Sequence, residues 1–212
     1  MTASRPRLFL VTPQLDDTAA FAGSIERVLA AGDVAAVLLR LNGADERTLV
    51  NRTKSVGKAV QPRDIALLLD GRPELVARAG ADGAHLSGID ALNAALSGLK
   101  PDRIAGAGGL RSRHDAMLAG EANADYVMFG EPDRLNAGSG RPPFSAVEDR
   151  VAWWAELFQP PCIGYAANTG EIRPLVQAGA DFIALGEWIW NEPAGAERTV
   201  AAASESLAGA GS

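Results

Sequence analysis

Residues 65–90, IALLLDGRPELVARAGADGAHLSGID, contain the unit of structure on which the fold assignment rests. An apolar run at residues 65–69 is followed by Asp70-Gly71, then by a short amphipathic segment, and then by a second apolar run at residues 84–86. Short continuous apolar runs are typical of strands that are covered on both faces, as in parallel sheets. Two parallel strands need a crossover, which the amphipathic segment supplies. The stretch therefore predicts a βαβ unit with polar residues, Asp70 and Asp90, after its two strands.

The same alternation of apolar runs and helical spacing continues along the whole chain. Gly80-Ala81-Asp82 and Gly179-Ala180-Asp181 each stand between a helix and the next strand, where glycine ends the helix in a left-handed conformation. The pattern predicts an α/β protein, a single-domain (β/α)8 TIM barrel over residues 1–212 with loose termini at 1–6 and 209–212. An open, doubly wound sheet is the alternative. The expected strands cover residues 8–11, 34–39, 65–69, 84–86, 103–107, 126–129, 162–165 and 182–185, each followed by a helix.

The composition of the chain argues against some classes of binding partner. Its net charge is −6 and no basic cluster stands out, so nucleic acid and anionic membrane surfaces are not expected partners. No apolar run reaches the length of a membrane span, and the N-terminus shows no signal peptide. The single cysteine, Cys162, is expected to be a buried strand residue of a cytoplasmic protein. The sequence leaves open whether the chain forms a homo-oligomer.

Several phrases of the sequence resemble those of the thiamine phosphate synthase (thiamine-phosphate pyrophosphorylase) and TenI-type family of barrels. Residues 80–86, GADGAHL, are similar to G-A-D-G-V-H-L in that family. Asp125-Tyr126 with Gly130-Glu131-Pro132 is similar to its D-Y-x-x-x-G-P. The resemblance covers nearly the whole chain and implies a TIM barrel of thiamine biosynthesis. It also implies a transferase that joins an aminopyrimidine diphosphate to a thiazole phosphate with Mg²⁺ and releases diphosphate.

The functional positions that the resemblance implies are only partly kept. Arg40 matches the arginine of the family's Q-L-R-x-K, but the lysine falls on Asn42. The magnesium-binding aspartate falls on Gly71, with Asp70 one position earlier, and the second carboxylate is kept as Asp90. The serine after strand five falls on Gly108, and the I-G-G-I after strand seven reads Ile163-Gly164-Tyr165-Ala166. These substitutions predict a degraded catalytic set.

Each candidate site residue has two interpretations. Arg40 is a catalytic or phosphate-binding residue, or it forms a salt bridge at the rim with Asp70 or Glu187. Asp70 and Asp90 share Mg²⁺, or they serve as a turn residue and a helix cap. His85 contacts the ligand, or it is a hydrogen-bonded residue of the barrel interior. The residues proposed for substrate or phosphate binding are Arg40, His85, Gly108, Gly164 and Gly186.

Two loops complete the expected site. Barrels commonly bind phosphate through backbone N–H groups near the last two strands, which here predicts an anion cradle over residues 164–170 and Gly186. Residues 133–143, DRLNAGSGRPP, are expected to form a polar loop after strand six. Such a loop either closes over the site as a lid or only connects a strand to the next helix.

The sequence supports two function hypotheses. In the first, the protein is an enzyme acting on a phosphorylated small molecule, a thiamine-phosphate diphosphorylase with a non-standard site. In the second, it is a non-catalytic binding or regulatory barrel of thiamine metabolism. A synthase needs a metal and several cations, and the sequence supplies one cation at the expected positions. We therefore expect binding of a thiazole phosphate or pyrimidine diphosphate with weak or no synthase activity.

Overall fold

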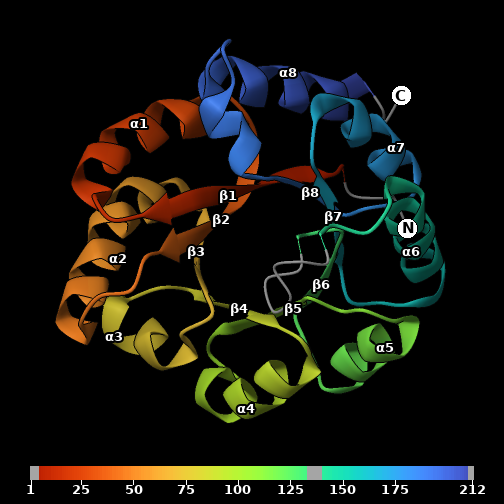
Figure 1. Ribbon diagram of the computed structural model, residues 1–212, viewed down its shortest axis with the longest axis horizontal. Helices are drawn as coiled ribbons and strands as arrows, with labels where there is room; N and C mark the ends of the chain where they lie inside the picture. Colours follow the sequence, from red (N-terminus) through yellow and green to blue (C-terminus); the bar gives the residue numbers. More distant parts are fainter. Residues whose placement is uncertain (1–4, 133–139, 210–212) are drawn as a thin grey trace.

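The computed structural model describes residues 5–132 and 140–209, which form a closed barrel of parallel strands surrounded by helices (Figure 1). The strands follow one another around the barrel in chain order, and the last pairs with the first to close it. The predicted single-domain TIM barrel is confirmed, and the open doubly wound sheet is excluded. In the part of the chain that is described, the strands are β1 (Arg7–Leu15), β2 (Val34–Leu41), β3 (Ala66–Asp70), β4 (Gly83–Ser87), β5 (Ile104–Gly108), β6 (Tyr126–Phe129), β7 (Cys162–Ala166) and β8 (Phe182–Leu185).

Helices follow the strands and form the outer layer of the barrel, as Figure 1 shows. Of the predicted loose termini, residues 1–4 and 210–212 lie outside the described residues, and the last helix extends to Gly209. The α-helices are α1 (Thr18–Ala30), α2 (Glu46–Val60), α3 (Val76–Ala79), α4 (Ile89–Leu99), α5 (Arg113–Glu121), α6 (Phe144–Leu157), α7 (Ile172–Gln177) and α8 (Ala196–Gly209). Short 3₁₀ turns are η1 (Gln61–Arg63), η2 (Pro73–Leu75), η3 (Thr169–Glu171) and η4 (Glu187–Asn191).

Several element boundaries differ from those expected from the sequence, among them the start of α6 and the end of β5. The apolar spacing of the sequence predicts a helix over residues 147–158, whereas α6 begins at Phe144, directly after Pro143 at its N-cap position. The strand β5 extends to Gly108, because that residue still pairs with Ser87 of β4. The second shift matters for the site, since it places Gly108 inside the barrel wall rather than in a loop.

The repeated aspartates before three of the strands tie neighbouring strands together. The carboxylate of Asp82 accepts a hydrogen bond from Leu67 N in the preceding strand, at 2.7 Å. Asp125 and Asp181 make the corresponding bonds to the backbone N–H of β5 and β7, at 2.6 and 2.8 Å. Gly80 and Gly179, which end the preceding helices, have φ of +71° and +94°, as the left-handed turn requires. The G-A-D phrase therefore ends a helix with its glycine and links two neighbouring strands through its aspartate.

The apolar core has an inner layer inside the barrel and an outer layer between strands and helices. Phe9, Leu38, Leu68 and Met128 pack inside the barrel. The outer layer includes Trp154 of α6, whose fully buried ring donates from Nε1 to the backbone oxygen of Pro160 at 2.7 Å. Among the described residues, no helix is both long enough and apolar enough to cross a bilayer.

Cys162 lies in β7 with no exposed surface, which confirms the expectation of a buried strand residue. Burial raises the pKa of its thiol to about 12, and the nearby Asp181 carboxylate adds to the shift.

Since the thiolate is the reactive form, the native protein is expected to be inert to a disulfide-exchange thiol reagent at pH 8. The same titration in denaturant should release one thiol per chain. Rapid reaction of the native protein would contradict this placement.

Candidate functional site

The polar residues of the expected site meet at the rim formed by the carboxyl ends of the strands. Arg40 lies at the end of β2, Asp70 ends β3, and Glu187 follows β8. Together with Glu131 and Tyr165, Arg40 and Glu187 line a small cavity of about 70 Å³ at the mouth of the barrel. In TIM barrels this end of the barrel carries the chemistry. The structure thus brings together residues that are separated by up to 147 positions in the sequence.

Arg40 forms ion pairs with two carboxylates. Its Nε lies 3.4 Å from Asp70 Oδ2, and its Nη1 contacts Glu187 Oε1. The side chains of Arg40 and Asp70 are 12% and 9% exposed, whereas Glu187 is 44% exposed. Burial lowers the pKa of the Arg40 guanidinium, and the nearby Tyr165 and Glu131 oppose that shift. The rim salt bridge, one of the two interpretations of Arg40, is therefore present with both predicted partners.

The two aspartates predicted to share Mg²⁺ lie in different surroundings. Asp70 is in the ion pair with Arg40, and Asp90 is an exposed residue in the first turn of α4. Gly71, at the position of the missing aspartate, has φ of +68°, which favours glycine. Among the described residues, no group of three or more His, Cys, Asp or Glu side chains is arranged to hold a metal. The donor set does not fit a magnesium ion well, and the shared metal stays a prediction.

His85 is fully buried in β4 and bonded through both ring nitrogens. Its Nδ1 lies 2.9 Å from the hydroxyl of Tyr126, and its Nε2 lies 3.2 and 3.3 Å from the two carboxylate oxygens of Glu131. Burial raises the pKa of the Tyr126 hydroxyl well above its ordinary value, and Glu131 adds to the shift. The tyrosine therefore stays a hydrogen-bond donor. This arrangement matches the interpretation of His85 as a hydrogen-bonded residue of the interior.

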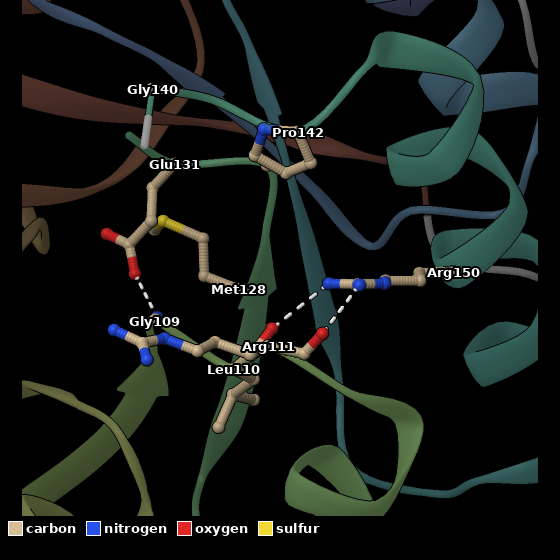
Figure 2. A pocket seen from close by; sticks show the side chains of 9 residues that line it. Gly109, Leu110, Arg111, Met128, Glu131, Gly140, Pro142 and Arg150 are labelled. Carbon is tan, nitrogen blue, oxygen red and sulfur yellow. Dashed lines mark hydrogen bonds between the residues drawn. The ribbon is translucent and has the colours of Figure 1, made fainter. Parts of the chain in front are cut away.

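Gly108 leaves room for the carboxylate of Glu131. A Cβ atom built on Gly108 would overlap both Glu131 Oε1 and His85 Nε2. The next residue, Gly109, donates its backbone N–H to Glu131 Oε1 at 2.5 Å (Figure 2). The space that a serine side chain would need at position 108 is thus taken by Glu131. A phosphate at Gly108 would meet that carboxylate.

The two glycines predicted for the anion cradle have packing roles. A Cβ on Gly164 would collide with Leu175 of α7, so this glycine allows the helix to approach the barrel wall. A Cβ on Gly186 would overlap the hydroxyl of Tyr165, a 7% exposed residue of β7. Tyr165 therefore covers Gly186. Burial raises the pKa of its hydroxyl, so the ring places a neutral group where an anion was expected.

Sequence reasoning missed Arg141, which binds the segment after β6 to the barrel. Its Nε donates to Gly130 O and its Nη2 to Tyr165 O, both at 2.6 Å. Its Nη1 lies 2.8 Å from Glu171 Oε1, and Glu171 Oε2 accepts the backbone N–H of Ala167 at 2.8 Å. Arg141 belongs to the proposed lid, residues 133–143, of which 133–139 lie outside the described residues. The sequence signal for this role is weak, since Arg141 stands among glycines and prolines.

A second cavity, of about 220 Å³, lies beside the first, between the segments that follow β5 and β6. Glu131 lines both cavities. Figure 2 shows Arg150 on the opposite side from Glu131, where it donates to the backbone oxygens of Leu110 and Arg111 at 3.1 and 2.7 Å. Arg150 therefore fixes the segment that carries Gly109. Glu131 is the side chain that the two cavities share.

Comparison with known proteins agrees with the resemblance seen in the sequence. A family model described as thiamine monophosphate synthase matches residues 8–189. A thiamine-phosphate synthase of Rhodospirillum centenum is 41% identical over 92% of this chain and 94% of the relative. One of Hyphomonas neptunium is 41% identical over 96% of each chain. The solved thiamine phosphate pyrophosphorylase of Pyrococcus furiosus has the same fold, with a TM-score of 0.77, 17% identity and 97% of each chain covered. This chain belongs to the thiamine monophosphate synthase family.

Proposed function

We propose that this protein binds a phosphorylated small molecule, a thiazole phosphate or pyrimidine diphosphate, at the barrel mouth and has weak or no synthase activity. The observation that carries the proposal is the double ion pair of Arg40 with Asp70 and Glu187. The guanidinium that would hold a departing diphosphate already has its charge compensated. Departure of diphosphate depends on cations placed where negative charge develops. A barrel mouth in which two carboxylates compensate Arg40 is better suited to binding a ligand than to catalysing the release of diphosphate.

Active synthesis is the second candidate, and two observations favour it. The relatives from R. centenum and H. neptunium carry the plain name thiamine-phosphate synthase at 41% identity. Glu187 is 44% exposed, so its side chain can turn toward solvent and leave Arg40 to an incoming anion. A synthase would then depend on a substrate-driven rearrangement at the end of β8. Magnesium and a location in the cytoplasm stay predictions under either candidate.

The variant Glu187→Gln tests whether this carboxylate competes with a phosphate for Arg40. It removes one negative charge and nearly keeps the shape, so thiazole phosphate should bind more tightly. A gain of about 1 kcal/mol, roughly fivefold in Kd, is reasonable for one partly solvated charge. Isothermal titration calorimetry with thiazole phosphate measures it.

The matched control is Glu121→Gln, which alters an exposed glutamate at the end of α5 and should leave the Kd unchanged. If the wild-type protein and Glu187→Gln both fail to bind thiazole phosphate and pyrimidine diphosphate, the proposed function is wrong. The mouth would then serve a neutral or cationic ligand.

A further inference from the structure

The short turn η4 begins two residues after the end of β8 and carries Glu187, Trp188 and Trp190. In the barrel wall β8 lies between β1 and β7, so η4 starts between the ends of these two strands (Figure 1). A 3₁₀ helix has about three residues per turn, so residues three positions apart lie on the same face. Glu187 and Trp190 therefore share one face of η4, and Trp188 lies on another.

Two indole N–H groups bind η4 to the strands on either side of β8. Trp190 Nε1 donates to Val11 O of β1 at 2.8 Å, and Trp188 Nε1 donates to Ala166 O of β7 at 2.9 Å. The two bonds hold opposite sides of the turn. Since Glu187 shares its face with Trp190, the bond to β1 is the one that fixes the side of η4 from which Glu187 extends.

The end of β1 also holds Arg40, the partner of Glu187 in the ion pair. The register between β1 and β2 shifts between Val11 and Gln14, so two residues of β1 lie opposite one residue of β2, which is a β-bulge. Thr12 in this bulge is fully buried, and its hydroxyl accepts the backbone N–H of Arg40 at 2.9 Å. Val11 and Thr12 are adjacent, so one short segment of β1 fixes both η4 and the backbone of Arg40.

The ring of Trp190 is packed on one side and open on another. Phe21 of α1 lies with its ring centroid 4.9 Å from that of Trp190. Both residues line a cavity of about 610 Å³ between α1, η4 and the start of α8. Because this cavity leaves space beside the indole, packing does not enclose the ring. The hydrogen bond to Val11 O supplies the directional contact that fixes its position.

We infer that Trp190 is a positioning residue of the mouth, which through its bond to Val11 O holds η4 so that Glu187 meets Arg40. An anionic ligand competes with Glu187 for the guanidinium, so its apparent affinity rises with the fraction of molecules in which Glu187 has left Arg40. A looser η4 raises that fraction. Trp190 thus controls phosphate access through Glu187 and not by contact with the ligand. The inference rests on the proposed function, because it assigns what regulates phosphate binding at Arg40.

Trp190→Phe keeps an aromatic ring and removes the N–H donor. By isothermal titration calorimetry it should bind thiazole phosphate about threefold more tightly than the wild-type protein, because η4 is held less firmly. In a Glu187→Gln background the same substitution should leave the Kd unchanged, since the competing charge is already gone. Trp153→Phe, on the outer helix α6, is the matched control and should bind as the wild-type protein does. Unchanged or weaker binding by Trp190→Phe, or an equal gain with and without Glu187, overturns the inference.

Chemical modification of Arg40 tests the inference without any phosphate. Phenylglyoxal reacts with guanidinium groups, and a carboxylate paired with the guanidinium hinders the reaction. Peptide mass spectrometry should show Arg40 reacting severalfold faster in Trp190→Phe than in the wild-type protein, and the exposed Arg47 of α2 reacting equally in both. Glu187→Gln and the double variant should react alike at Arg40. No acceleration in Trp190→Phe, or a further acceleration in the double variant, overturns the inference.

A third measurement uses the wild-type protein and needs no variant. The rings of Trp190 and Trp153 are both partly exposed, and the bond to Val11 O protects the indole N–H of Trp190. Hydrogen exchange followed by NMR should therefore be slower at Trp190 than at Trp153. Exchange at Trp190 as fast as at Trp153 overturns the inference, because the bond on which it depends would be absent.

The calorimetric and chemical experiments together separate the two proposals. If Trp190→Phe accelerates modification of Arg40 through Glu187 while no protein binds thiazole phosphate or pyrimidine diphosphate, the proposed function alone fails. If thiazole phosphate binds while Trp190→Phe changes neither its Kd nor the modification of Arg40, the inference alone fails.

Discussion

Replacing Arg40 by methionine is expected to lower the free energy of unfolding by about 3 kcal/mol at neutral pH. The substitution keeps an apolar chain of similar length but leaves the carboxylate of Asp70, 9% exposed, without the guanidinium beside it. Removing one partner of a buried ion pair costs more than the pair itself contributes, because the remaining charge stays in the interior with less compensation. Urea denaturation followed by circular dichroism measures the change.

An exposed ion pair provides the matched control for this experiment. Arg27 lies 2.7 Å from Glu197, with side chains 66% and 49% exposed, so Arg27→Met should cost less than about 1 kcal/mol. The double variant Arg40→Met/Asp70→Asn also removes the charge of Asp70 and should recover part of the loss. Equal costs for Arg40→Met and Arg27→Met would show that the pair of Arg40 and Asp70 is not buried as described.

Gly108→Ser is expected to destabilise the protein by about 2 kcal/mol, because the new side chain overlaps Glu131 and His85. In a Glu131→Ala background the same substitution should cost less, since the conflicting carboxylate is gone and the overlap with His85 remains. The difference between the two costs, a coupling free energy of about 1 to 2 kcal/mol, is obtained from a double-mutant cycle. Thermal or urea unfolding of the four proteins supplies the values.

Gly98→Ser controls for the loss of a glycine as such. Nothing lies within 4 Å of a Cβ built on Gly98 in α4, and serine suits a helix better than glycine does. This variant should be neutral or slightly stabilising. An identical cost of Gly108→Ser with and without Glu131 would mean that the glycine is needed for another reason, and the assignment of the space to Glu131 would be wrong.

The fold could be predicted because its signals are local and repeated. The apolar runs recur in every unit, and the G-A-D phrase places a helix stop before the fourth and the eighth strand. The bonds from Asp82, Asp125 and Asp181 to the preceding strands were not predictable, because they join residues 15 to 20 positions apart through three-dimensional packing.

The sequence indicated that Arg40, Asp70 and Glu187 lie near one another at the rim, but not how the other rim side chains contact one another. The salt-bridge interpretation of Arg40 is present in the structure with both Asp70 and Glu187. The sequence did not predict that Tyr165 covers Gly186. The spacing of residues along the chain does not show which ring on one strand reaches the end of the next strand. The relation of Gly108 to Glu131 was missed for the same reason, since 23 positions separate two residues whose side-chain volumes compensate one another.

The most direct test of the central claim, that the ion pairs of Arg40 with Asp70 and Glu187 limit turnover at this mouth, is a thiamine phosphate formation assay. Purified protein is incubated with Mg²⁺, thiazole phosphate and aminopyrimidine diphosphate, beside the 41% identical relative from R. centenum. Each lost transition-state contact costs on the order of a hundredfold in rate, although such losses do not add fully. We expect a kcat at least about a thousandfold below that of an active synthase. A kcat within about tenfold of such an enzyme would contradict the account and assign the protein as a synthase whose carboxylates leave Arg40 when substrate binds.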